Sequence, residues 1–201
     1  MYQVHSIKAF SDNYIWALQG KDNYCAIVDP GDAKPVIAYL ESKKLALTEI
    51  LLTHHHPDHV GGVKELKDAF PACQIFGPDT PRFKPFTTGL KPGQSITLKA
   101  TNTSFDVIDL SGHTCDHIGF IDTNNAFVGD TLFSIGCGRL FEGTAEQMFN
   151  SLNKLKGLKD NISVYCAHEY TLANIEFASA VEPNNPALLE YQQSVKSGLA
   201  Q

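Results

Sequence analysis

The chain has 201 residues, a length that suits one compact domain with a continuous buried core. Its 16 lysines and arginines face 22 aspartates and glutamates, which gives a formal net charge of -6 at pH 7. This acidic balance argues against the broad basic surface that nucleic-acid binding requires, so we expect no nucleic-acid partner. An anionic small molecule would have to meet a local basic patch.

The cysteines also constrain the class of protein. They are odd in number, lie far apart and form no C-x-x-C pair, which is typical of reduced thiols in a reducing compartment. They are Cys25, Cys73, Cys115, Cys137 and Cys166. Residues 1–10 lack the basic start and long apolar stretch of a signal peptide, and no apolar run approaches membrane-spanning length. We expect a soluble cytoplasmic monomer with no membrane partner.

The first part of the chain predicts a meander of strands followed by alternating helices and strands. β-Branched and aromatic residues between polar turns indicate strands, and apolar residues at helical spacing indicate helices. The expected strands are Tyr2–Ala9, Tyr14–Leu18, Tyr24–Asp29, Glu49–Thr53 and Cys73–Phe76. The expected helices are Pro35–Lys44 and Val60–Phe70, the second ended by Pro71.

The second part repeats the same logic. Its expected strands are Ser95–Leu98, Ser104–Leu110, Ile118–Asp122, Ala126–Val128 and Ile162–Cys166. Thr144 and Gln147 have the spacing of a capping box and open a helix to about Leu158, and a further helix is expected over Thr171–Val181. Two groups of strands, each with helices to cover an outer face, predict an α+β fold with two mixed sheets packed face to face.

A histidine cluster follows the strand that ends at Thr53. His54, His56, Asp58 and His59 form an H-x-H-x-D-H pattern between a strand and a helix. Imidazole nitrogens and carboxylate oxygens bind Zn²⁺ at about 2.0 to 2.2 Å, and ligands two residues apart converge only where the chain curves sharply. The pattern therefore indicates a metal site, and the competing interpretation is a polar loop with a chance run of histidines.

Three more potential ligands follow near the ends of expected strands: His113 in S-G-H-T, Asp130 in G-D-T and His168 in A-H-E. Each alone has an ordinary explanation, a surface histidine in two cases and a turn carboxylate or helix cap in the third. Together with the cluster they make seven groups, enough for two four-coordinate metals that share one carboxylate and one solvent oxygen.

These motifs resemble the metallo-β-lactamase superfamily, and several others look like its glyoxalase II (hydroxyacylglutathione hydrolase) family. The resemblance runs from about Ile7 to Glu182. It rests on Asp12–Tyr14, Val28–Gly31, Thr53–Gly62, Gly129–Phe133, Gly136–Arg139, Phe141–Thr144 and His168–Thr171, of which the last three are specific to the family. It implies an αββα sandwich, with a catalytic domain over residues 1–168 and a truncated C-terminal helical segment over residues 169–201.

The resemblance also implies the metals and the reaction. Two Zn²⁺ ions, replaceable by iron or manganese, would be held by His54, His56 and His113, by Asp58, His59 and His168, and by a bridging Asp130. A hydroxide between the metals would split S-D-lactoylglutathione and related S-2-hydroxyacylglutathiones into glutathione and a hydroxy acid such as D-lactate. Asp58 and Asp130 would be the catalytic residues.

Further residues follow from the same resemblance. Arg139, Phe141 and Tyr170 would contact glutathione, although Arg139 could equally be a solvated surface residue. Many family members have tyrosine where this chain has Phe141, so one hydroxyl contact would be missing. His55 and His117 are not ligands in the family and are expected to support the structure or the ligands.

Several alternatives stay open at this point. The family normally continues into a helical domain with a basic Arg-x-x-Lys pair, whereas this chain stops at Gln201, as a short form or a truncated one. A broad thioesterase or an inactive metal-binding homologue is therefore a possible outcome. A glutathione persulfide dioxygenase with one iron is the nearest rival enzyme, but such relatives lack the motifs Leu140–Thr144 and His168–Tyr170.

Overall fold

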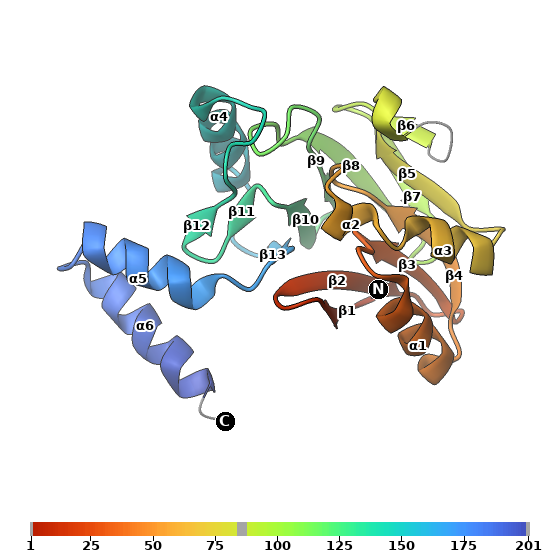
Figure 1. Ribbon diagram of the computed structural model, residues 1–201, viewed down its shortest axis with the longest axis horizontal. Coiled ribbons are helices and arrows are strands. Elements are labelled where there is room, and N and C mark those ends of the chain that lie inside the picture. Colours follow the sequence, from red (N-terminus) through yellow and green to blue (C-terminus); the bar gives the residue numbers. More distant parts are fainter. Residues whose placement is uncertain (1, 84–87, 200–201) are drawn as a thin grey trace.

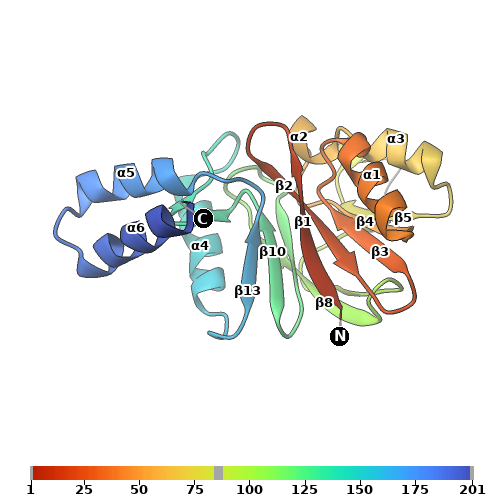
Figure 2. The ribbon, with the colours of Figure 1, turned by 90° about the horizontal axis from the view of Figure 1, so that it is seen from below.

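The computed structural model describes residues 2–83 and 88–199. Two β-sheets lie face to face, and helices cover their outer sides (Figures 1 and 2). The strands of the larger sheet are, in spatial order, β1 (Gln3–Ala9), β2 (Asn13–Gln19), β3 (Tyr24–Val28), β4 (Ala46–Leu51), β5 (Gln74–Pro78) and β6 (Thr88–Leu90). Strands β1 to β3 pair antiparallel, and β3 to β6 pair parallel.

The second sheet has five strands and is antiparallel except where β13 pairs with β10. In spatial order they are β13 (Ser163–Cys166), β10 (Asn125–Gly129), β9 (Ile118–Ile121), β8 (Thr103–Asp109) and β7 (Ser95–Leu98). A short ribbon of β11 (Leu132–Phe133) and β12 (Gly136–Cys137) follows β10. Both sheets are mixed, as the sequence predicts.

Three apolar layers hold this arrangement together. Helices α1 (Ala33–Lys43) and α3 (Val63–Ala69) pack on the outer face of the larger sheet, where Val36 and Leu66 are fully buried. Between the sheets, Leu18 and Leu51 of the larger sheet meet Phe105 of the smaller one. Helix α4 (Ala145–Lys156) covers the other outer face. The predicted αββα sandwich is therefore confirmed.

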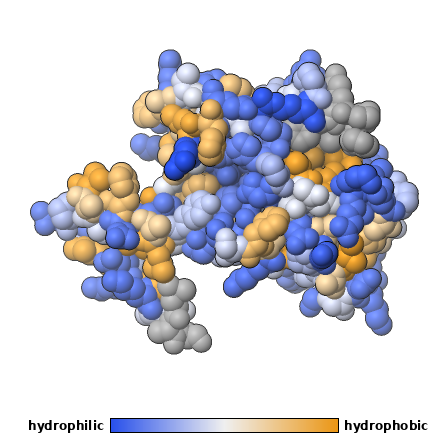
Figure 3. Space-filling view, in the orientation of Figure 1, coloured by the Kyte–Doolittle hydropathy of each residue, from blue (hydrophilic) through white to orange (hydrophobic). Residues whose placement is uncertain are grey.

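Helices α5 (Thr171–Val181) and α6 (Pro186–Leu199) project from the sandwich as an arm (Figures 1 and 2). Apolar surface gathers on this arm in the space-filling view (Figure 3), where Phe177 is 71% exposed and Val181 62% exposed. Within residues 2–83 and 88–199, no helix is both long enough and apolar enough to cross a membrane.

The structure corrects some expected elements. The helix expected over Val60–Phe70 is α3, which begins only at Val63, and Gly61 and Gly62 separate it from a single-turn helix that was not predicted, α2 (Pro57–Val60). A side chain at Gly62 would lie 2.7 Å from the carbonyl oxygen of Pro30, so this turn is pressed against the loop after β3. The short strands β6, β11 and β12 and the 3-10 turn η1 (Pro81–Phe83) have no counterpart among the predicted elements, whereas helix α6 falls within the helical segment expected over residues 169–201.

Candidate metal centre

The histidine cluster lies at the end of β4. Residues 53–56 form the loop, and Pro57 is the first residue of the single-turn helix α2, where its missing N–H costs no hydrogen bond. Asp58 and His59 are thus on a helix and not in a turn. A side chain at Gly31 would lie 1.8 Å from the carbonyl oxygen of Asp58, so only glycine lets the neighbouring loop lie flush against α2.

The first group of side chains brings three ring nitrogens together. The Nε2 atoms of His54 and His113 each lie 3.0 Å from Nδ1 of His56. Three nitrogens at tetrahedral positions around Zn²⁺ would lie about 3.3 Å apart. Burial lowers the pKa of all three imidazoles, so each ring is neutral and has a lone pair for a metal near pH 7. This group suits a cation.

The second group combines one carboxylate with two imidazoles. Oδ2 of Asp58 lies 3.5 Å from Nε2 of His59 and 3.3 Å from Nε2 of His168. The three ligand atoms lie within 4.8 Å of one another. A hydrogen bond from His168 and the charge of His59 outweigh burial and hold the pKa of Asp58 well below its usual range, so this carboxylate stays ionised at neutral pH.

Asp130 lies between the two groups and faces both. Its Oδ1 is 3.3 Å from Nε2 of His59 and 3.4 Å from Nε2 of His168, while its Oδ2 is 3.3 Å from Nε2 of His113. Nε2 of His59 and Oδ1 of Asp130 are buried and make no hydrogen bond. Buried polar atoms normally have a partner, and a metal ion would supply it. The donor set therefore fits a pair of metal ions.

The other ring nitrogen of each buried histidine is held from outside. Nδ1 of His59 contacts Oδ2 of Asp29 at 3.0 Å, and Nδ1 of His168 contacts Oδ1 of Asp12 at 2.7 Å. His113 donates from Nδ1 to the carbonyl oxygen of Arg139 at 2.7 Å. Such partners fix the ring and leave Nε2 as the free ligand atom.

His54 is held through a hydroxyl. The side chain of Thr53 donates to Oδ2 of Asp29 at 2.7 Å, so its oxygen can accept from Nδ1 of His54, which is 3.0 Å away. Asp29 also accepts the backbone N–H of Thr53 at 2.8 Å. One buried carboxylate therefore orients two of the histidines.

His59 and His168 differ from the first group in their protonation. Burial alone would lower their pKa values. The neighbouring carboxylates outweigh burial and raise both pKa values to about 10. They are Asp29 and Asp130 for His59, and Asp130, Asp58 and Asp12 for His168. Without a metal both rings are in the positively charged imidazolium form at neutral pH. A metal at the second group must therefore displace protons.

The two histidines that were not expected to be ligands have different surroundings. His117 is fully buried, its Nε2 accepts the backbone N–H of Asp130 at 3.1 Å, and its ring stacks on His54 at 4.7 Å between centroids. Burial lowers the pKa of His117 to about 3, which keeps this acceptor nitrogen unprotonated. Nδ1 of His55 lies 3.3 Å from Oδ1 of Asp116.

Sequence reasoning assigned no role to Asp12, Asn13 or Asp29, although all three fall within the quoted motifs. Asn13 donates to Oδ2 of Asp58 at 3.0 Å. Asp29 has a φ of 51°, unusual for a residue other than glycine, and this bend turns its carboxylate toward the histidines. An aspartate at the end of a buried strand directly before Pro-Gly was the available signal.

A cavity of about 530 Å³ opens over the metal groups. Its walls include the three residues expected to contact substrate, Arg139, Phe141 and Tyr170. The Phe141 ring meets the rings of His56 and His113 edge to face, with centroids 5.4 and 5.3 Å apart. Tyr170 stacks on His168 at 4.9 Å. The structure thus brings the predicted substrate residues and the predicted ligands to one cavity.

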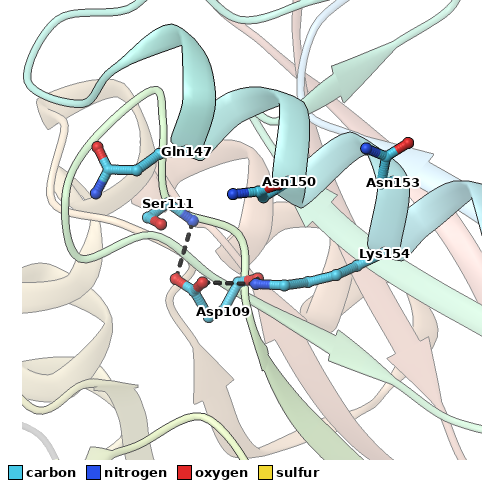
Figure 4. Close-up of a pocket in the computed structure, with 6 residues that line it drawn as sticks. All are labelled: Asp109, Ser111, Gln147, Asn150, Asn153 and Lys154. Atoms are coloured by element: carbon cyan, nitrogen blue, oxygen red, sulfur yellow. Dashed lines mark hydrogen bonds and ion pairs between the residues drawn. The ribbon is translucent and has the colours of Figure 1, made fainter.

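A second hollow of about 530 Å³ lies beside α4 (Figure 4). It is lined by Asp109, Ser111, Gln147, Asn150, Asn153 and Lys154. Lys154 donates to Oδ2 of Asp109 at 2.6 Å, and the backbone N–H of Ser111 donates to Oδ1 of the same residue at 3.1 Å. Its one carboxylate is satisfied and it contains no histidine, so the metal chemistry belongs to the first cavity.

Two family models match the chain, the metallo-beta-lactamase superfamily over residues 10–168 and the hydroxyacylglutathione hydrolase C-terminus over residues 169–201. Fold and site thus define a metallo-beta-lactamase superfamily protein. The chain is 50% identical over 201 residues to hydroxyacylglutathione hydrolase 2 of Vibrio vulnificus (strain YJ016), covering all of this chain and 79% of that protein. It is 54% identical over 196 residues to the hydroxyacylglutathione hydrolase of Pseudoalteromonas translucida, covering 97% and 76%. The chain belongs to the hydroxyacylglutathione hydrolase family, as its motifs indicate.

Solved structures agree on the fold. ETHE1 from Myxococcus xanthus superposes with a TM-score of 0.74 at 25% identity, covering 85% of this chain and 76% of that one. The BLEG-1 B3 metallo-beta-lactamase superposes with a TM-score of 0.71 at 25% identity, covering 84% and 92%. Proteins with different names therefore share this fold, so the activity has to be argued from the residues of the site.

Proposed function

We propose that this chain hydrolyses the thioester of S-D-lactoylglutathione and related S-2-hydroxyacylglutathiones. The observation that carries the proposal is Asp130, whose two carboxylate oxygens face two separate groups of metal ligands at the floor of one cavity. The relatives that share about half of its residues are named hydroxyacylglutathione hydrolases. The geometry supports two metals, and the relatives' names support a hydrolase.

We propose zinc for both positions, with iron or manganese as possible substitutes. His54, His56 and His113 would hold one ion, Asp58, His59 and His168 the other, and Asp130 both. When bound, the ions would supply Lewis-acid activation of the thioester carbonyl and of water near neutral pH. Binding and orienting the substrate and the water would fall to the side chains around the cavity.

Those residues would orient the reactants. Asp58 lines the cavity and stays ionised, so its carboxylate can accept a hydrogen bond from an attacking water and orient it. Phe141 and Tyr170 form apolar walls that confine the substrate. The Arg139 guanidinium lies 5.8 Å from the centre of the Phe141 ring, where it can pair with a glutathione carboxylate. The phenyl ring of Phe141 offers no hydroxyl for a further hydrogen bond.

The proposal is tested by comparing the turnover of S-D-lactoylglutathione with that of a simple thioester that lacks the glutathione moiety. We expect zinc-dependent hydrolysis of both and a higher kcat/KM for the glutathione substrate. Chelation should abolish the activity, and added zinc should restore it. Equal efficiency on both substrates would indicate a broad thioesterase, and a zinc-loaded protein without turnover would contradict the proposal.

A dioxygenase with a single iron is the rival activity. It needs one group of ligands, whereas this cavity has a second complete group in Asp58, His59 and His168. Metal analysis combined with an oxygen electrode separates the two activities. Two metals per chain without oxygen uptake supports the hydrolase, and one iron with oxygen uptake on a glutathione persulfide refutes it.

We further propose that residues 1–168 form the catalytic domain and residues 169–201 a helical segment attached to it. The division falls where the two family models meet, just before the arm of α5 and α6. We also propose a cytoplasmic monomer that binds a small glutathione thioester and neither nucleic acid nor membrane. All five cysteines are free, which suits a reducing compartment.

A further inference from the structure

Residues 138–143 form a loop that contacts the first metal group through both side chain and backbone. The carbonyl oxygen of Arg139 accepts from Nδ1 of His113, and the ring of Phe141 packs against the rings of His56 and His113. The backbone N–H of Phe141 also donates to the carbonyl oxygen of His113 at 3.2 Å. The position of this loop therefore decides how the ring of His113 is held.

Two glycines bring both ends of the loop into backbone contact with the centre. A side chain at Gly138 would lie 1.9 Å from the carbonyl oxygen of Asp130, and one at Gly143 would lie 2.5 Å from that of Gly112. Backbone contact of this kind excludes sideways adjustment but supplies little attraction of its own. The hydrogen bonds to His113 attach the loop to the centre, and one of its side chains attaches it to other segments.

Glu142 supplies that attachment. Its Oε1 accepts from Nη1 of Arg82 at 2.7 Å, and its Oε2 accepts the backbone N–H of Cys115 at 3.1 Å. Nη1 of Arg82 also lies 2.7 Å from Nε2 of His55, the residue between the ligands His54 and His56. Arg82 on η1 therefore joins the histidine loop and the loop of residues 138–143.

The neighbouring acidic groups do not form a further metal site. His55, Asp116 and Glu142 are close enough to hold a cation, but the guanidinium of Arg82 already lies among them and provides the positive charge. The side chain of Arg82 is 47% exposed and that of Glu142 26% exposed. An isolated ion pair of this exposure contributes little stability, so a positional role explains it better.

We propose that Arg82 and Glu142 are positioning residues, a pair that fixes the loop of residues 138–143 and through Arg139 orients His113 for the first metal. The proposal rests on the proposed function in that it assumes metals at the two groups. Neither residue lines the cavity, so neither touches the reacting atoms. Their effect is transmitted through the Arg139 carbonyl and the Phe141 ring.

The test measures zinc affinity by competition with a chromogenic chelator, together with kcat and KM. For Glu142→Ala we expect about a tenfold loss of affinity at one zinc, the size typical of partners that hold a ligand from outside. Arg82→Ala should give a smaller loss in the same direction, and Arg82→Lys should recover most of it. KM should rise, because Arg139 and Phe141 lose their fixed positions.

The double variant Arg82→Ala with Glu142→Ala should bind zinc no more weakly than Glu142→Ala alone, because the two side chains act as one unit. The matched control is Lys64→Ala, which removes another ion pair of 2.7 Å, with Asp68 on α3, away from the cavity. We expect this control to keep zinc affinity and KM unchanged.

Unchanged zinc affinity and KM in both single alanine variants would overturn the proposal, as would losses that simply multiply in the double variant. If Glu142→Ala does not fold, the two Arg82 variants decide the question, since nearly half of that side chain is in solvent. Zinc competition requires no turnover. A chain that binds zinc but hydrolyses nothing refutes the proposed function alone, while an active chain with unaffected variants refutes only this inference.

Discussion

At the scale of single residues, Asp130 has the most demanding position. It is 6% exposed, its Oδ1 makes no hydrogen bond, and both oxygens face imidazole nitrogens of different metal groups. A buried carboxylate without such neighbours would be strongly destabilising. The side chains of His168 and His59 outweigh burial and hold the pKa of Asp130 well below its usual range.

Asp130→Asn tests the bridge. An amide is a poor shared ligand, so we expect loss of the second metal and a fall in kcat on the order of 100-fold or more. Metal stoichiometry by mass spectrometry and steady-state rates measure both effects. Asp68→Asn, on the exposed face of α3, is the matched control. Full metal content and rate in Asp130→Asn would show that this residue is not the bridge.

The raised pKa values of His59 and His168 predict how the metal-free protein depends on pH. Their folded values of about 10 exceed the ordinary 6.5, so the stabilisation is complete below about pH 6.5 and is lost as the pH rises toward 10. The urea concentration at the unfolding midpoint of the metal-free protein should therefore decrease as the pH is raised from 7 to 10. Zinc should weaken this dependence and release protons on binding. A flat or rising midpoint without metal would contradict the assignment.

At the scale of elements, strands and helices bring residues close, and glycines decide how closely the connecting loops can approach. The loop at Gly138 lies against the backbone of Asp130, and Gly61 and Gly62 interrupt the helix after the histidine cluster where it meets the loop at Pro30. Helical periodicity runs through Gly61 and Gly62, which is why the sequence predicts one helix there. Only the neighbouring loop, from a distant part of the chain, explains the interruption.

Gly138→Ala tests the contact between loop and strand. Its new methyl group would overlap the Asp130 carbonyl oxygen, so the loop must shift. We expect a loss of about 1 to 3 kcal/mol in the free energy of unfolding, as for other overpacked sites, together with weaker zinc binding. Gly157→Ala is the control, because its nearest contact would be an ordinary 3.4 Å. Equal behaviour of the two variants in urea unfolding would exclude the tight contact.

At the scale of the whole molecule, the sandwich and the arm differ in how they are held. The sheets are buried on both faces. Helix α6, by contrast, packs against α5 and contacts the β11–β12 turn through the hydroxyls of Tyr191 and Ser134, which lie 2.6 Å apart. Of the described side chains of α6, Leu188 is the buried one. The metal centre lies in the sandwich, so it does not depend on α6.

Hydrogen exchange on the full chain should reveal this difference. Helices with few buried apolar contacts open locally at low free energy, so amides of α6 should exchange much faster than those of β8, β9 and β10. Zinc should slow exchange in the loops around the metal centre and leave α6 unchanged. Protection of α6 equal to that of the central strands would show that the arm packs more firmly than its exposure indicates.

Much of this architecture follows from local patterns. Alternating apolar residues located the main strands to within a few residues, and the capping box at Thr144 located the start of α4. The spacing of the histidine cluster identified a metal site because ligands close in sequence share one sharp bend. Strands of two or three residues, such as β6, β11 and β12, are too short to carry a period, and the sequence does not reveal them.

The chain's own residue types and spacing determined the fold class, the family and the set of side chains with metal-binding chemistry. Tertiary structure alone decided how those side chains are oriented, because the groups that hold them come from far along the chain. Asp12 holds His168 across 156 positions, and the carbonyl of Arg139 holds His113 across 26. A hydrogen bond to a backbone carbonyl depends on the path of the chain and not on the identity of the side chain, so no sequence pattern records it.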